Sequence, residues 1–187
     1  MSQSAVDCCN SALQRVGAAS ILSLSDNSPE ARACALAYDS NRRDELRKHR
    51  WNFAIKRVVL GPDTAAPAFD FLYAFTLPSD CLRVIRPATS NLDWQIEGRK
   101  ILTNDGKVVN LRYLADIEDA TQWDASFYNV MSASLAIDIC EKLTQSNTKK
   151  QQLTSDYKDG VADARKVDAF EGGPDDAADD AWWTVRY

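Results

Sequence analysis

Residues 42–56 read RRDELRKHRWNFAIK, and the spacing of the apolar side chains changes inside this stretch. Up to Leu46 the apolar residues follow the three-and-four spacing of one helix face. From Trp51 onward, Trp51, Phe53 and Ile55 alternate with smaller or polar residues, which is the period of a strand with one buried face. We therefore predict that a helix gives way to a strand near residue 50.

Two helices are predicted before this junction, at residues 4–16 and 29–49. Ser4 and Ser28 stand where each helix begins, and serine is a favoured N-cap. Gly17 follows the first helix and suits a left-handed C-terminal cap. The basic residues near the end of the second helix complement the negative end of its dipole.

After the junction, residues 51–115 predict a β-rich module of short antiparallel strands. Aromatic and apolar residues alternate over 69–77, which predicts another strand. Residues 104–106 are Asn-Asp-Gly, a tight-turn signal. We expect this turn to join 100–103 and 108–114 as a hairpin.

Two more helices are predicted at 124–144 and 147–170, with Asp124 and Asn147 as their caps. The predicted fold class is α+β: a bundle of about four helices, an inserted antiparallel β-rich module and an extended C-terminal tail. These parts comprise residues 1–50 with 116–172, residues 51–115, and residues 173–187.

The negative charge of the chain is concentrated at one end. The net charge is −5 over 187 residues. Residues 171–187 hold five acidic side chains and one basic side chain, Arg186, so they account for −4 and leave −1 for residues 1–170. A nearly neutral body argues against generic binding of nucleic acid.

The sequence offers no set of residues for catalysis, a metal ion or a cofactor. Five cysteines without a C-x-x-C motif predict reduced, buried thiols, and His49 is the single histidine, expected at the surface of a helix end. No glycine-rich phosphate loop occurs. We also expect no signal peptide, no membrane span and folding in a reducing cytosol. The chain is therefore predicted not to be an enzyme.

The basic residues around the helix-to-strand junction form the first candidate site. Seven basic and two acidic residues lie between Arg42 and Arg57, and aromatic residues are interleaved with them. The pattern allows a solvated or subunit-interface surface, a contact with DNA, or a contact with the acidic tail of a neighbour. The candidate residues are Arg42, Arg43, Arg47, Lys48 and Arg50.

Several motifs in order resemble one family. They are residues 43–53, which end in HRWNF, then FTLPSDCLRV at 75–84, WQIEGRKIL at 94–102, and LRY at 111–113 before an aspartate-containing turn. Leu135-Ala136 and Leu143-Thr144 continue the match, so it covers about residues 5–165. The chain resembles the head-to-tail adaptors of tailed bacteriophages, of the tail tubular protein A type.

The resemblance implies a structural virion protein of the tail or neck, assembled in the host cytoplasm. Such adaptors form a ring, typically of twelve subunits, that joins the portal to the next tail component (a nozzle or tail tube protein). The ring extends the channel through which genomic DNA passes, without sequence specificity. The family implies a helical bundle with a β-rich insertion and no catalytic residues, cofactor or membrane partner. The alternative is a DNA-binding or regulatory module that uses residues 42–57.

The tail contains a second candidate site. An acidic, alanine-rich spacer leads to an aromatic end, and large aromatic side chains are the usual anchors of protein interfaces. We expect this end to dock into the portal or an adjacent subunit. The candidate docking residues are Trp182, Trp183, Val185, Arg186 and Tyr187.

Overall fold

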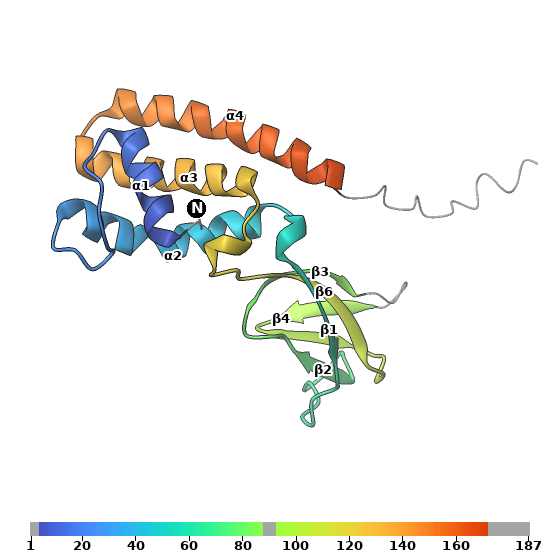
Figure 1. The fold of residues 1–187 in the computed structure, drawn as a ribbon. Coiled ribbons are helices and arrows are strands. Elements are labelled where there is room, and N and C mark those ends of the chain that lie inside the picture. The colour runs from blue at the N-terminus through green and yellow to red at the C-terminus, as the bar shows by residue number, and fades with distance from the viewer. Residues whose placement is uncertain (1–3, 88–92, 172–187) are drawn as a thin grey trace, which may run out of the picture.

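The computed structural model describes residues 4–87 and 93–171, which form a helical bundle beside a smaller β-rich module (Figure 1). The bundle contains α1 (Ala5–Val16), α2 (Pro29–Lys48), α3 (Ala125–Thr144) and α4 (Asn147–Glu171). The module contains β1 (Ile55–Leu60), β2 (Tyr73–Thr76), β3 (Cys81–Pro87), β4 (Trp94–Glu97), β5 (Lys100–Thr103) and β6 (Val109–Ala115). Two short 3-10 turns, η1 (Asn52–Ala54) and η2 (Ala120–Gln122), flank the module. The fold is mixed α+β, as predicted.

The first three helices begin where the sequence supplies a capping side chain. Ser4 and Asp7 form a reciprocal capping box at the start of α1. Ser28 accepts a hydrogen bond from the backbone of the first turn of α2, and Asp124 does the same for α3. Gly17 ends α1 at φ +87°, a conformation that only glycine adopts without steric cost.

The start of α4 differs from the prediction by one residue. The side chain of Ser146, and not that of Asn147, accepts a hydrogen bond from Lys149 N at 3.3 Å. The backbone carbonyl of Ser146 accepts from Lys150 N, so Ser146 is the N-cap and Asn147 is the first helical residue. Both residue types cap helices well, which is why the sequence pattern alone predicts the cap one position late.

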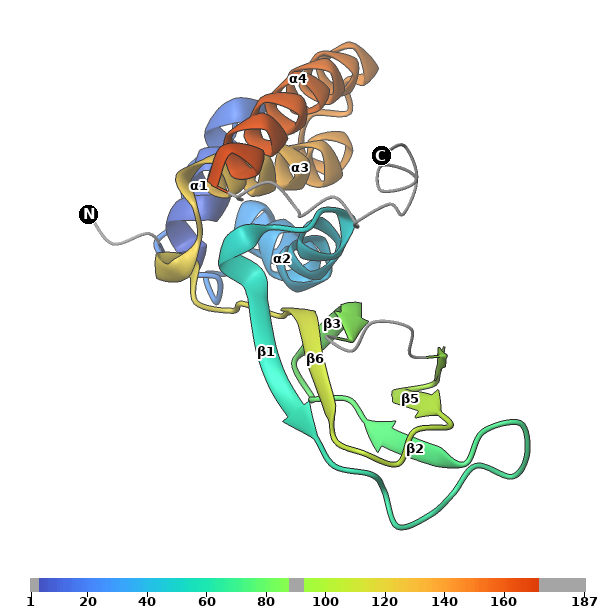
Figure 2. The ribbon, with the colours of Figure 1, turned by 90° about the vertical axis from the view of Figure 1, so that its right-hand side faces the viewer.

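α3 is the central helix of the bundle and packs against α1, α2 and α4. Figures 1 and 2 show it between α4 on one side and α2 on the other. Its buried apolar side chains lie on more than one face: Phe127, Met131, Leu135 and Ile139 form one row, and Val130, Ala133, Ala136 and Cys140 are also buried. A helix that is covered on several sides has apolar residues around most of its circumference, and the sequence of α3 meets this condition.

The module consists of two antiparallel three-stranded sheets. Their strand orders are β1-β6-β3 and β2-β5-β4. Buried side chains from both sheets, including Phe75, Ile101, Leu111 and Tyr113, belong to the same core as the buried face of the bundle. The module is therefore attached to the bundle by continuous packing as well as by the chain.

Three predictions for the module need correction. Residues 52–54 form η1, and β1 begins only at Ile55, because Trp51 turns inward and packs edge-on against Phe127. The alternating stretch 69–77 contributes only residues 73–76 to a strand, and Phe69 is exposed. β5 and β6 belong to different sheets, so residues 104–108 connect the sheets and do not form a hairpin turn.

Gly106 serves packing and not turn geometry. It is not among the residues with positive φ. A Cβ atom placed on Gly106 would lie 2.5 Å from Tyr73 Cζ, well inside van der Waals contact. The glycine is needed because the ring of Tyr73 lies against the backbone at this position.

Candidate interaction surface

The predicted basic cluster is divided by the structure into buried and accessible residues. Arg42 is only 4% exposed. Its Nε donates to Asp116 Oδ1 at 3.0 Å and its Nη1 to Asp39 Oδ1 at 2.8 Å. Asp116 directly follows β6, so this pair joins α2 to the point where the chain leaves the module. Arg42 is therefore buried and paired within the chain, which leaves its guanidinium group little accessible surface for the predicted contact with DNA or a neighbouring copy.

Arg43, Arg47 and Lys48 are exposed but also have partners within the chain. Arg43 Nε donates to Asp116 Oδ2 at 2.8 Å, and Arg47 donates to the carbonyl of Leu82 in β3. Lys48 Nζ lies 2.7 Å from Asp44 Oδ2. Arg50 is half-buried. Much of the positive charge in the cluster is therefore balanced by carboxylates of the same chain.

Glu45 is a buried carboxylate that connects three helices. It is 2% exposed and lies on α2. Ser134 of α3 donates to its Oε1 at 2.7 Å, and the Tyr157 hydroxyl of α4 lies 3.0 Å from both carboxylate oxygens. Lys48 Nζ, 2.8 Å from Oε1, supplies the positive charge that a buried carboxylate needs. No sequence pattern indicates this site, because Glu45 resembles any other acidic residue within a basic stretch.

The last turn of α4 is fixed to the start of the module through Asp168. His49 Nε2 lies 3.2 Å from Asp168 Oδ2, and Asn52 N donates to Oδ1 at 2.9 Å. The Asn52 side chain also donates to the backbone carbonyl of Asp168 at 2.6 Å. His49 is therefore half-buried, and not a surface histidine as predicted. Burial lowers its pKa despite Asp168, and the charges of Arg165 and Arg83 act in the same direction.

A second basic surface lies on the β1-β6-β3 sheet and was not predicted. Arg57 of β1 is paired with Arg112 of β6, which is paired in turn with Arg86 of β3. Residues paired across antiparallel strands project from the same face of a sheet, so these three arginines form a row. Arg83, paired with Leu114 two positions along β6, belongs to the same face. We call Arg57, Arg83, Arg86 and Arg112 the arginine face.

The arginine face has no counter-charge in the part of the chain that the structure describes. Within residues 4–87 and 93–171, none of the four guanidinium groups makes a hydrogen bond or an ion pair, although Arg83 lies near enough to His49 to influence its pKa. Arg57 and Arg86 are exposed, and Arg83 and Arg112 are half-buried. A shallow hollow of about 320 Å³ lies beside Arg57, Val59, Asn110 and Arg112.

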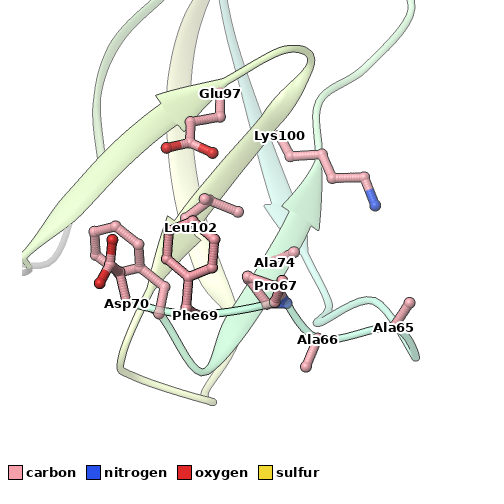
Figure 3. A pocket seen from close by; sticks show the side chains of 11 residues that line it. Ala65, Ala66, Pro67, Phe69, Asp70, Ala74, Glu97, Lys100 and Leu102 are labelled. Carbon is pink, nitrogen blue, oxygen red and sulfur yellow. The ribbon is translucent and has the colours of Figure 1, made fainter.

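A second hollow of about 320 Å³ lies in the module between the loop at 65–71 and strands β2, β4 and β5. Figure 3 shows Phe69 and Asp70 from the loop beside Glu97 and Leu102 from the strands. Lys100 also lines this hollow, but its Nζ forms an ion pair with Asp63 Oδ2 at 2.8 Å. Among the described residues, the lining contains no histidine, cysteine, serine or threonine side chain.

Several other titratable groups in the described residues are buried or paired within the chain. All five cysteines are reduced and buried, as predicted, and burial raises the pKa of Cys8 to about 12. Over residues 4–87 and 93–171 no three His, Cys, Asp or Glu side chains are grouped so as to hold a metal ion. Asp138 accepts from Asn41, and Glu141 pairs with Lys150. No helix in the described ranges is long and apolar enough to cross a membrane.

The predicted docking residues Trp182, Trp183, Val185, Arg186 and Tyr187 lie outside the described residues. No protein-family model matches this chain, and no curated protein matches it significantly in sequence. The function therefore has to be inferred from the fold and from its surfaces.

Proposed function

We propose that the chain is a structural subunit of a head-to-tail adaptor ring in a tailed bacteriophage. The observation that carries the proposal is the position of the module. A β-rich module lies between the second and third helices of a four-helix bundle, which is the arrangement that the resemblance implies. In this proposal the ring, of about twelve copies, joins the portal to the next tail component and surrounds the passing DNA.

The contacts of the junction support a rigid subunit. Two side-chain pairs lie where the chain enters and leaves the module. His49 with Asp168 lies at the entry, and Arg42 with Asp116 lies at the exit. A ring that joins two other components needs subunits in which the bundle and the module keep a fixed orientation to each other. Hydrogen-bonded pairs that are largely buried supply such a fixed geometry.

Exposed apolar side chains on two different helices of the bundle suggest how copies meet. Leu36 on the first half of α2 is 76% exposed, and Phe170 on the last turn of α4 is 89% exposed. α2 begins at one end of the bundle and α4 ends at the other (Figure 1). A ring requires two different surfaces on each subunit that complement each other head to tail. In the proposal, the Leu36 surface of one copy contacts the Phe170 surface of the next.

The direct test mixes the protein with the portal protein of its own phage and examines the product by native mass spectrometry and electron microscopy. We expect a stoichiometric ring on the portal. A parallel sample lacking residues 174–187 should fold but fail to attach, if the aromatic end is the portal anchor. A protein that stays separate from the portal under all assembly conditions would contradict the adaptor function.

The competing function, a DNA-binding module, has one observation in its favour, the arginine face. Phosphate contacts by arginine make binding strongly salt-dependent. This function predicts that the isolated monomer binds duplex DNA at low salt and loses it as salt rises. The adaptor proposal predicts weak duplex binding by the monomer, because the net charge of the chain is −5.

A further inference from the structure

The arginine face gathers four positive side chains on one face of a sheet, and the described residues supply no acidic partners for them. Like charges directly opposite each other on neighbouring strands destabilise a sheet, and here three arginines lie in one row. The described residues place no carboxylate against them. An anion bound on this face would offset the repulsion between the arginines and stabilise the sheet.

The dimensions of the face favour a chain with several charges over a single small ion. Three adjacent strands span about 10 Å from Arg57 to Arg86, since neighbouring strands lie about 4.8 Å apart. Arg83 and Arg86 lie opposite Leu114 and Arg112, which are two residues apart on β6, and this adds about 7 Å in the other direction. A ligand that meets all four groups must therefore carry carboxylates or phosphates over at least this distance.

The end of α4 lies close to this face. Asp168 is held by His49 and Asn52, and the charge of Arg83 lowers the pKa of the same histidine. Glu171, the last residue of α4, is only three residues beyond Asp168, about 4.5 Å along a helix. The segment of chain beyond α4 therefore starts near the arginine face.

This C-terminal segment has an acidic sequence. Asp175, Asp176, Asp179 and Asp180 lie within nine residues of Glu171. A chain of nine residues can reach about 30 Å, which is more than the dimensions of the face. A tethered segment also has an effective concentration in the millimolar range, which favours it over a free ligand of equal charge.

From these relations we infer that residues 175–180 lie across the arginine face of the same chain, with their carboxylates paired to its guanidinium groups. Duplex DNA, which is also negatively charged, is the ligand that would compete with this segment for the arginine face. The tethered segment is favoured because it starts beside the face and because the rest of the chain is almost neutral. The inference does not depend on the proposed function, since it requires neither a ring nor a portal.

Cross-linking of the full chain tests the contact directly. Single Arg57→Lys, Arg86→Lys and Arg112→Lys variants keep the charge and introduce an amine that a carbodiimide joins to a neighbouring carboxylate. We expect amide cross-links from each new lysine to residues 175–180, reduced at high salt. The exposed native residues Lys107 and Lys158 are the matched controls and should give few such links.

A mixture of ¹⁵N-labelled and unlabelled protein shows whether both ends of a cross-link come from one chain. Links within one isotopic form support the inference, and links mainly between forms overturn it in favour of a second copy. Links to residues 175–180 that are as frequent at Lys107 and Lys158 as at the new lysines also overturn it.

The competing DNA ligand is tested with a labelled duplex. Changing the four aspartates at 175, 176, 179 and 180 to asparagine should uncover the face and tighten duplex binding at least tenfold at low salt. Adding Arg57→Glu and Arg112→Glu to that variant should remove the gain. The opposite result is that the unchanged chain binds the duplex through Arg57 and Arg112 as tightly as the asparagine variant does. In that case the face is a DNA site that the segment leaves open, and the inference is wrong.

Discussion

Arg42 Nε lies 3.0 Å from Asp116 Oδ1, and both side chains are almost completely buried. Arg42 is in the second half of α2, and Asp116 is the first residue after β6. The backbone amide of Asp116 also donates to the carbonyl of Asp80 at 2.8 Å, just before β3. One buried ion pair thus connects the bundle with two strands of the module.

Removal of Arg42 is expected to destabilise the whole fold. Arg42→Met removes the buried partner of Asp116 and leaves only the exposed Arg43 beside it, and a poorly compensated buried charge is costly. We expect a loss of about 3 kcal/mol in the free energy of unfolding, measured by urea denaturation. Arg43→Met is the matched control. Its side chain is 59% exposed, so the same measurement should show a loss below about 1 kcal/mol. Equal losses for both variants would contradict the structural role of Arg42.

The Glu45 site makes a prediction at alkaline pH. Burial, together with the charge of Glu45, raises the pKa of the Tyr157 hydroxyl to about 12. The unfolded chain loses this proton near pH 10, so the stabilisation is complete below pH 10 and is lost as pH rises toward 12. Glu45→Gln should lower the pKa of Tyr157, as measured by absorbance at 295 nm against a Tyr157→Phe reference. An unchanged titration would mean that Glu45 does not act on this hydroxyl.

The secondary structure was largely accessible from the sequence because local signals agreed with the fold. Capping side chains at Ser4, Ser28 and Asp124 marked three helix starts. The position of Trp51 could not be predicted from the sequence. Its alternation with Phe53 has the period of a strand, whether the two residues lie in a strand or fold inward at a 3-10 turn. Packing against Phe127, which is distant in the sequence, selects the turn.

The candidate surface was harder to predict from the sequence, because it too is decided by contacts between residues that are distant in the chain. Arg42 and Arg43 look alike in the sequence, and only tertiary packing buries the first and exposes the second. The arginine face depends on which strands are neighbours and on their register. Arg57 and Arg112 are far apart in the chain, and no local pattern indicates that they are paired.

His49 offers a second pH-dependent measurement with a single reporter, because it is the only histidine. Burial lowers its pKa, so the folded protein resists protonation of the ring more than the unfolded chain does. Stability is therefore complete above about pH 6.5 and falls as pH drops through the folded pKa. NMR titration of the imidazole should give a pKa below 6.5, and Asp168→Asn should lower it further because Asp168 favours the charged ring. A pKa above 6.5 would contradict the described environment.

The contact between Gly106 and Tyr73 predicts a specific coupling between two substitutions. Gly106→Ala places a methyl group 2.5 Å from Tyr73 Cζ, so the ring must move and lose packing. We expect a loss of about 1 kcal/mol, within the range for overpacking. In a Tyr73→Ala background the same substitution should be nearly neutral, and urea denaturation of the four proteins measures this coupling. Gly61→Ala, where nothing lies within 4 Å, is the control.

The proposed head-to-tail contact between copies predicts complementation. Leu36→Asp and Phe170→Asp each place a charge on an exposed apolar position, so both variants should fold and neither should form rings on the portal. Each variant keeps the surface that the other lacks. A mixture should therefore form a one-to-one dimer that cannot extend, detectable by native mass spectrometry at high protein concentration.

The control for this experiment is Leu72→Asp, which changes a similarly exposed apolar residue of the module and should leave ring assembly intact. A head-to-tail contact is the only arrangement in which two assembly-deficient variants restore a single interface between them, because a self-complementary contact would be impaired in both. Variants that still assemble, or a mixture that stays monomeric at concentrations where the unchanged protein forms rings, would therefore reject the pairing of Leu36 with Phe170.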